Sequence, residues 1–395
     1  MPSLCLYFQV HQPVRLNRFS VFNIGSDHHP KSTYFDNTLN QKIFEKVAYK
    51  CYLPTNHLMY DLIKEYNGRF KISYSITGTF VEFCEEYMPE VLDSFKDLKN
   101  TGCVDFIDET YYHSLCGLYD DLNEFEDQVK LHQQMLKKHF NHKADVFRNT
   151  ECIYDNRIAQ KVADLGYKAI LTEGSNNILG WRSPNYLYNA ASAPNLKVLM
   201  RNYQLSDDVG FRFSSKGWPG WPLTADKYSY WLSHNQGDVI NLFMDYETFG
   251  EHQWNDTGIF DFLRHLPGEI LKYDHLNFLT VAEATQAYPS HDVIDVPWAI
   301  SWADEDRNVS TWLGNDMQVA CFEELKALAP KIKQTNDPEL LHTWRLLQTS
   351  DHLYYCSTKG FEDGNVHAYF SPYDIPYDGF INYMNVIQDL KDKVQ

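Results

Sequence analysis

The sequence predicts an α/β barrel followed by a helical region. Short apolar runs with high β propensity recur through the first 300 residues, with helical stretches between them. Several of these runs are almost continuously apolar, which is typical of strands buried on both faces of a parallel sheet. Beyond about residue 300 the strand signals fade and helical periodicity replaces them. We therefore expect a barrel over residues 1–300 and a helical region over residues 301–395 that packs on it.

Each element follows from a local pattern. The candidate strands are eight apolar runs, at 4–10, 70–77, 103–107, 144–149, 168–172, 197–203, 238–245 and 276–281. Helical periodicity over about three turns or more marks the segments 40–65, 125–140 and 156–165. A stretch rich in Asn, Ser and Pro predicts a loop over the surface at 175–196. Three helical patterns close the chain, near 317–333, 338–352 and 379–393.

Charge and composition exclude several classes of partner. The chain has 395 residues and a formal net charge of -18, so a phosphate backbone or an anionic lipid surface would repel it. An uncharged substrate meets no such repulsion. Aromatic residues make up 15% of the chain, and their rings suit the apolar faces of sugars, although rings of this kind also fill cores. We expect no nucleic-acid partner and no membrane partner.

The cysteines and the first apolar run predict a cytoplasmic protein. The eight cysteines form no C-x-x-C pair and no regular short spacing, so we expect reduced thiols and neither a disulfide framework nor a metal knuckle. The run 4–10 lacks a basic leader and continues into His11, Gln12 and Pro13, so it reads as a core strand and not as a signal peptide. No run approaches the roughly 20 apolar residues of a membrane span.

Polar and acidic side chains follow most of the candidate strands. In a barrel of this kind the carboxyl ends of the strands converge on one face and build the active site. The residues at these positions are His11, Gln12, Gly78, Thr79, Asp108, Glu109, Glu151, Glu173, Asp245 and Glu247. Some of the carboxylates, Asp108 and Glu173 above all, have an alternative role as helix caps or first-turn charges.

Glu151 and Asp245 are the best candidates for paired carboxylate chemistry. Glu151 lies between a strand and a helix, and Asp245 closes the apolar run VINLFMD. Cleavage of a glycosidic bond with retention requires one carboxylate that attacks the anomeric carbon and one carboxylic acid that protonates the leaving oxygen. The interpretation depends on both residues lying on the same face of the barrel.

Several motifs resemble those of glycoside hydrolase family 57. They are LYFQVHQPVR at the N-terminus, ETYYHSL at 109–115, FRNTECIYDN around Glu151, RNYQLSDDVGFRFS at 201–214, FMDYETFGEHQ around Asp245, SWADEDRNVSTWLGNDMQ at 301–318 and LQTSDHLYY at 347–355. The resemblance implies a distorted (β/α)7 barrel with an appended helical region, and a retaining mechanism on α-linked glucans without a metal or other cofactor. It maps the nucleophile onto Glu151 and the acid/base onto Asp245. A barrel of seven strands also implies that one of the eight candidate strands is peripheral.

Ten further residues are candidates for substrate binding. The resemblance places His11 beside the scissile bond, and Asp351 matches a polar position of a later motif. Trp302, Asp304 and Trp312 form either a wall for glucose units or a fastening between the helical region and the barrel. The full set is His11, Gln12, Glu109, His113, Arg148, His252, Trp302, Asp304, Trp312 and Asp351.

The two carboxylates require different environments. Glu151 must stay ionised in order to attack, whereas Asp245 must hold its proton until the leaving group departs. We expect Arg148 or another nearby cation to keep Glu151 charged. We expect the apolar run before Asp245 to desolvate that carboxyl and raise its pKa.

Three alternatives remain open at this point. His11, His113, Asp245 and His252 are possible zinc ligands of a metal-dependent deacetylase or mannosidase, although no short-range ligand pair is present. A glucan-binding protein without turnover is an alternative from another class. Among enzymes, 4-α-glucanotransferase and branching enzyme share the glycosyl-enzyme intermediate with α-amylase. We prefer α-amylase because the chain is short; linkage preference, substrate length and oligomeric state are not determined by the sequence.

Overall fold

Five parallel strands form the first sheet of the computed structural model, which describes residues 2–394. The strand order is β3-β2-β1-β8, with β1 Ser3–Val10, β2 Ile72–Ile76, β3 Val104–Phe106 and β8 Val239–Asp245. The short strand β9 (Asn277–Phe278) pairs with the first residues of β1. In the register of β1 and β8, Gln9 lies opposite Asp245, so both of these strands end at the same edge.

The second sheet has the order β10-β6-β7-β5-β4. Its strands are β4 Val146–Arg148, β5 Ala169–Glu173, β6 Leu187–Ala190, β7 Lys197–Arg201 and β10 Ser290–Ile294. All pairs are parallel except β6 with β7. The strands β4, β5 and β7 therefore run parallel to one another, whereas β6 and β10 extend the second sheet beyond β7.

Both edges of the first sheet, β3 and β8, meet the second sheet. A parallel bridge joins Asp108, after β3, to Phe147 of β4. At the other edge the backbone N–H of Asn202, after β7, donates a hydrogen bond of 2.9 Å to the carbonyl of Asn241 in β8. Seven parallel strands thus follow one another through the two sheets, and their regular pairing is interrupted at these two joints. The α/β fold with a C-terminal helical part confirms the prediction.

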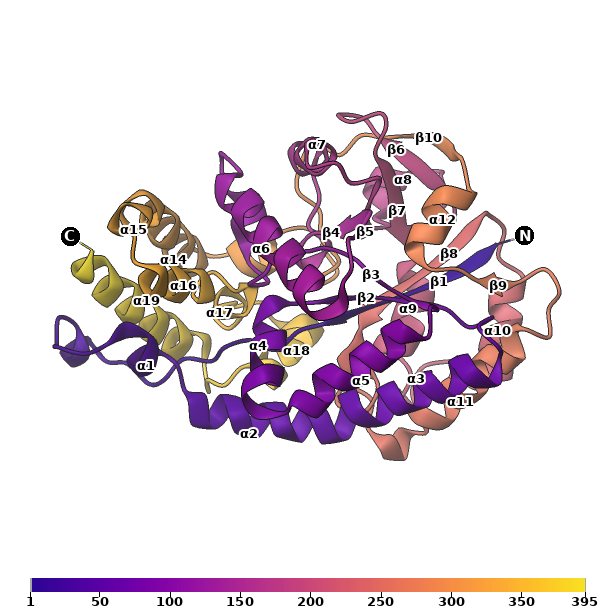
Figure 1. Cartoon of the computed structure of the whole chain (residues 1–395), viewed down its shortest axis with the longest axis horizontal. Coiled ribbons are helices and arrows are strands. Elements are labelled where there is room, and N and C mark those ends of the chain that lie inside the picture. The colour runs from indigo at the N-terminus through magenta and orange to yellow at the C-terminus, as the bar shows by residue number, and fades with distance from the viewer. Residues whose placement is uncertain (1, 395) are drawn as a thin grey trace.

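Helices cover the outside of the sheets and form the C-terminal part (Figure 1). In the first 300 residues the helices are α1 Pro30–Tyr34, α2 Asn37–Val47, α3 Leu53–Glu65, α4 Gly78–Tyr87, α5 Pro89–Asn100, α6 Asn123–Phe140, α7 Asn156–Asp164, α8 Asn176–Leu179, α9 Tyr203–Gly210, α10 Ala225–Ser233, α11 Ile259–Ile270 and α12 Val281–Ala287. The later helices are α13 Ser310–Leu313, α14 Asp316–Ala327, α15 Ala329–Thr335, α16 Pro338–Leu346, α17 Ser350–Tyr354, α18 Phe361–Phe370 and α19 Pro376–Lys393. Figure 1 shows α14, α15, α16 and α19 gathered beside α1, on the side away from β9 and β10.

Sequence patterns located these seven parallel strands but missed two others. The candidate strand at 276–281 forms only the two-residue strand β9, so it is the peripheral one. The prediction of a surface loop at 175–196 is wrong in part, because this stretch contains α8 and the largely buried strand β6. Its apolar run is only four residues long and lies among Pro, Asn and Ser, which concealed it. The exposed strand β10 was also not predicted.

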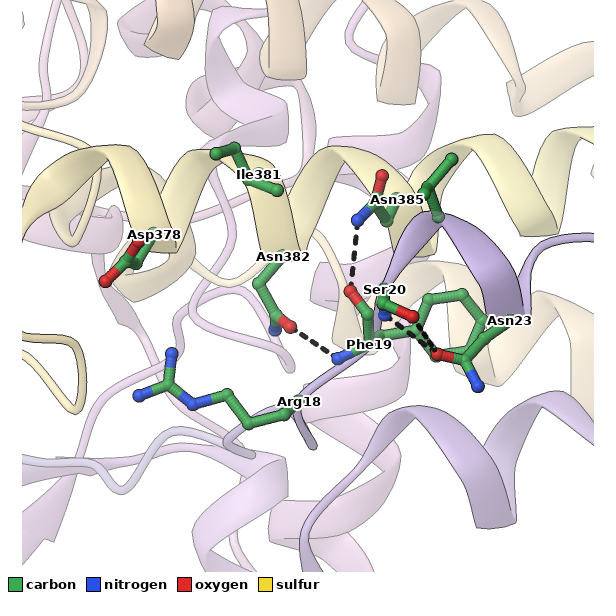
Figure 2. Close-up of a pocket in the computed structure, with 9 residues that line it drawn as sticks. Arg18, Phe19, Ser20, Asn23, Asp378, Ile381, Asn382 and Asn385 are labelled. Atoms are coloured by element: carbon green, nitrogen blue, oxygen red, sulfur yellow. Dashed lines mark hydrogen bonds between the residues drawn. The ribbon is translucent and has the colours of Figure 1, made fainter.

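The N-terminal segment before α1 is fastened to the last helix. Asn382 of α19 accepts a hydrogen bond of 2.6 Å from the Phe19 backbone N–H, and Asn385 donates one of 3.1 Å to the Phe19 carbonyl (Figure 2). A pocket of about 480 Å³ lies at this junction, with Arg18 and Asp378 on its wall. The amides that line it are engaged in holding two parts of the chain together, and the pocket is separate from the strand ends described below.

Buried residues form one large apolar cluster that extends from the strands into the C-terminal helices. All eight cysteines are buried and none forms a disulfide. Within residues 2–394, no helix combines the length and the apolar character that crossing a bilayer requires.

Candidate active site

Glu151 lies on a sharp turn directly after β4. It sits in a short 3-10 turn, Thr150–Cys152, in which Glu151 has a φ of 57° and Cys152 a φ of 52°. Left-handed backbone is unusual for residues with a side chain, and it occurs often at functional sites. At this turn the carboxylate contacts side chains of three other segments, those of His113, Trp302 and Ser350.

Three side chains donate hydrogen bonds to the carboxylate of Glu151. The indole Nε1 of Trp302 lies 2.8 Å from Oε2. The other oxygen, Oε1, lies 3.0 Å from the hydroxyl of Ser350 and 3.3 Å from Nε2 of His113. Hydrogen bonds to the ionised form stabilise it and hold the carboxylate in one orientation.

His113 bridges two carboxylates. Its Nδ1 lies 3.3 Å from Oε2 of Glu109, and its Nε2 faces Glu151. Burial alone would lower the pKa of His113, but the hydrogen bonds and charges of Glu109 and Glu151 raise it to about 9. Burial opposes ionisation of Glu109 too, yet His113 lowers the pKa of this carboxyl to about 2. At neutral pH the arrangement is an imidazolium between two carboxylates.

The pKa of Glu151 is lowered despite its burial. Burial raises it, and the hydrogen bond and charge of His113 lower it more, with further contributions from Arg148 and Trp302. The predicted cation is therefore present, but His113 contributes more than Arg148. Arg148 is fully buried, at 0% exposure, and its guanidinium lies 4.5 Å from the ring centre of Trp302.

Asp245, at the end of β8, is in the opposite state. Burial, followed by the negative charge of Glu151, raises the pKa of Asp245 to about 6. In the described part of the chain, no side chain donates a hydrogen bond to its carboxyl group. Asp245 lies opposite Gln9 in the register of β8 and β1, and the Gln9 amide donates a hydrogen bond of 2.9 Å to Glu109. Because His113 joins Glu109 to Glu151, the two carboxyl groups lie at the same end of the strands.

Glu247 is a second buried acid beside Asp245. Its Oε1 accepts hydrogen bonds from the Tyr52 hydroxyl at 2.5 Å and from the His11 backbone N–H at 3.4 Å. Burial, with the charge of Asp245 as the next cause, raises the pKa of Glu247 to about 8. Gln12 is also buried, and its amide donates to the same Tyr52 hydroxyl at 3.0 Å.

His11 and Asp351 form a polar pair at the site. Nε2 of His11 lies 3.1 Å from Oδ2 of Asp351, and Nδ1 lies 3.0 Å from the Thr77 hydroxyl. The ring stacks on His113 with 4.1 Å between ring centres. Burial and the charge of His113 lower the pKa of His11. Burial raises the pKa of Asp351, but the hydrogen bond to His11 outweighs burial and lowers this pKa to about 2. Asp351, distant in sequence, thus reaches the end of β1.

Trp302 is held in a cluster of charged residues. Arg307 contacts Glu173 at 2.9 Å and Asp207 at 3.5 Å, and Arg201 contacts the same two carboxylates at 3.1 and 2.5 Å. The guanidinium of Arg201 lies 5.7 Å from the ring centre of Trp302. Glu173 is therefore an ion-pair partner at the end of β5 and does not cap a helix.

The three remaining candidates, Asp304, Trp312 and His252, form no hydrogen bond with Glu151 or Asp245 in the described part of the chain. Asp304 is bound to Lys359, His367 and Thr311 of the helical region. Trp312 is 1% exposed and leaves no ring face open to a sugar. The positions of Asp304 and Trp312 favour the fastening alternative for both. The ring of His252 packs edge-on against Phe370 at 5.2 Å, and burial lowers its pKa to about 4.

Sequence reasoning missed Ser350, Thr77 and Arg307 at this site. Ser350 precedes Asp351 within a quoted motif, and that adjacency was the only available signal. Serine and threonine are common in every loop, so residue type alone does not distinguish them. Among the described residues, no group of three or more His, Cys, Asp or Glu side chains is arranged to hold a metal ion.

Comparison with known proteins identifies the family. The sequence profile of glycosyl hydrolase family 57 matches residues 5–297. The chain belongs to glycosyl hydrolase family 57. It is 50% identical over 394 residues to the "Putative alpha-amylase" of Methanocaldococcus jannaschii, a match that covers 97% of this chain and 83% of that protein.

Solved structures of family 57 enzymes share the fold. A GH57-type branching enzyme from Pyrococcus horikoshii superposes with a TM-score of 0.68 at 15% identity, covering 93% of this chain and 88% of the other. The α-amylase AmyC from Thermotoga maritima superposes with a TM-score of 0.60 at 14% identity, covering 93% and 91%. The chain thus shares its fold with these enzymes, and the profile match shows that it is a glycoside hydrolase of family 57.

Proposed function

We propose that this family 57 enzyme hydrolyses α-glucans with retention of anomeric configuration, and that Glu151 is the nucleophile and Asp245 the general acid/base. The observation that carries the proposal is the opposite perturbation of two neighbouring carboxyl groups. Glu151 has a lowered pKa, and Asp245 has a pKa raised to about 6. Carboxyl groups that share a site but differ in this way can divide the roles of nucleophile and acid.

The reaction follows from these protonation states. Glu151 attacks the anomeric carbon as the glycosidic bond breaks, and Asp245 transfers its proton to the leaving oxygen, so that a glycosyl ester forms on Glu151. Asp245, now a carboxylate, then takes a proton from water. The oxygen of that water bonds to the anomeric carbon and the ester bond to Glu151 breaks, which restores both residues.

His11, Asp351 and Trp302 are the proposed substrate contacts. Their polar atoms surround the end of β1 and the carboxylate of Glu151. We further propose that residues 1–300 carry both reacting carboxyls and that residues 301–395 complete their surroundings. Eight buried thiols without a disulfide support a reducing cytoplasm as the location.

α-Amylase is the preferred activity. It is supported by the 50% identity to a protein of that description. The shared fold of a branching enzyme keeps transfer to a sugar acceptor as the second candidate. Incubation with maltoheptaose separates the two, since hydrolysis gives only shorter sugars and transfer also gives longer ones.

The same assay tests the residue roles. We expect Glu151→Gln to lower the release of sugars by at least about a thousandfold, because no other group can form the ester. Asp93→Asn, which removes an exposed carboxylate from a surface ion pair, is the matched control and should retain wild-type activity. If Glu151→Gln bound maltoheptaose and turned it over at the wild-type rate, the proposed roles would be wrong. If the wild-type protein bound the sugar without turnover, the protein would be a binding protein.

A further inference from the structure

Ser350 contacts Glu151 but has no part in the mechanism above. Its hydroxyl donates a hydrogen bond of 3.0 Å to Oε1 of Glu151, and the residue is fully buried at the start of α17. A buried hydroxyl aimed at a reacting carboxylate, from a segment 199 residues away in the chain, requires an explanation.

The backbone of Ser350 is fixed independently of its hydroxyl. Its N–H donates a hydrogen bond of 3.0 Å to the carbonyl of His113, and the preceding residue, Thr349, forms an antiparallel bridge with Ser114. His113 in turn donates to the same oxygen of Glu151. Ser350, His113 and Glu151 thus form a closed ring of contacts in which the serine hydroxyl is the one link made by the Ser350 side chain.

The two oxygens of Glu151 are used differently. Among the residues that the structure describes, Oε1 receives two donors, Ser350 and His113, whereas Oε2 receives one, the indole N–H of Trp302. A carboxylate oxygen has two lone-pair directions. Both directions of Oε1 are occupied, and Oε2 retains one that can point to the anomeric carbon.

We propose that Ser350 is a positioning residue for the reaction: its hydroxyl anchors Oε1 of Glu151, so that Oε2 is the oxygen that attacks. The helical region is then a working part of the catalytic apparatus and not only a support. This inference rests on the proposed function of Glu151. Because a hydrogen bond to a carboxylate favours the ionised form, Ser350 also helps to keep Glu151 charged at acidic pH.

Ser350→Ala tests the proposal, because it removes the hydroxyl and keeps the backbone contact with His113. We expect kcat on maltoheptaose to fall roughly tenfold to a hundredfold, the range for a hydrogen bond to a charged group. The acid limb of the pH profile should move up by roughly one unit, since Glu151 then protonates more easily. KM should change little, and Ser350→Thr, which restores a hydroxyl, should recover most of the activity.

Thr349→Val is the matched control. Thr349 is a buried neighbour whose hydroxyl donates 2.9 Å to the carbonyl of Tyr112 and not to Glu151. This variant should lose stability without any movement of the acid limb. A wild-type kcat and pH profile for Ser350→Ala would overturn the inference, as would an equal shift in Thr349→Val.

The proposed function fails in a different way. An inactive wild-type protein, or an active Glu151→Gln variant, would remove the proposed function and this inference with it, whereas an active wild type with a silent Ser350→Ala removes the inference alone. If Ser350→Ala does not fold, Ser350→Thr decides. A pH profile with the wild-type acid limb supports the role of the hydroxyl, whereas an acid limb that shifts although the hydroxyl is present contradicts that role.

Discussion

Glu109→Gln gives the sharpest view of how Glu151 is kept ionised. Glu109 is 0% exposed, and its carboxylate faces Nδ1 of His113 on the side away from Glu151. The substitution preserves the size of the side chain and one acceptor oxygen and removes the charge. It also places an NH2 group where a carboxylate oxygen accepts a hydrogen bond from Gln9 or His113. Because His113 lies between the two carboxylates, the main effect on Glu151 acts through His113.

The magnitude follows from the state of His113. The net rise in its pKa from 6.5 to about 9 corresponds to roughly 3 kcal/mol, which is what Glu109 and Glu151 together contribute beyond the cost of burial. Loss of about half of this weakens the imidazolium, which in turn stabilises Glu151 less. We expect kcat/KM on maltoheptaose at pH 7 to fall about tenfold, and the acid limb to move to higher pH.

Stability adds a second readout for the same variant. The folded pKa of Glu109, about 2, lies below its ordinary value, so the carboxylate contributes stability above about pH 4.5 that is lost as the pH falls towards 2. The difference in free energy of unfolding between wild type and Glu109→Gln, measured in urea, should therefore shrink in acid. Glu124→Gln is the control for the loss of a buried carboxylate outside the site, because Glu124 pairs with Arg345 and Lys333 and not with His113. An unchanged pH-rate profile in Glu109→Gln would refute the reasoning.

The remaining predictions concern the acid, the ion pairs and metal. Asp245→Asn should lose roughly a hundredfold or more on maltoheptaose but much less on maltosyl fluoride, whose leaving group needs no proton; equal losses would contradict the assignment. In the wild type kcat/KM should fall above about pH 6 as Asp245 loses its proton. Glu247→Gln should not move this basic limb of the pH profile, because Glu247 has a pKa of about 8 and is already neutral near pH 6. Arg307→Met should lower the free energy of unfolding by about 1.5–3 kcal/mol, since Glu173 keeps only Arg201; an unchanged urea midpoint would argue against the pairing. EDTA should leave activity unchanged, and a loss that added metal restores would favour the metal-dependent alternative.

The seven parallel strands that follow one another through the two sheets were predictable, because each is a largely buried run that ends in a polar residue or is followed by one within two positions. Val239–Asp245 shows this best, since six buried residues lead directly to the carboxyl of Asp245. The same logic placed Glu151 correctly after β4. Strand β6 was not predictable, because its four residues gain their burial from β7 and β10 and not from a pattern of their own.

The surroundings of the carboxyls were only partly predictable. A cation near Glu151 was expected, but its main source is His113, whose raised pKa depends on the position of Glu109 in space. The contribution of Ser350 could not be foreseen, since it depends on how α17 docks against the loop after β3. Sequence spacing contains no information about such contacts between distant segments.

The most direct test is to trap the glycosyl-enzyme. The wild-type protein is incubated with a 5-fluoro maltosyl fluoride, which forms the ester faster than water can remove it, and the digested protein is analysed by mass spectrometry. We expect the added mass on Glu151 alone, and products of maltoheptaose that keep the α configuration. A label on another carboxylate, or a β-configured product, would contradict the assignment of Glu151 as the nucleophile.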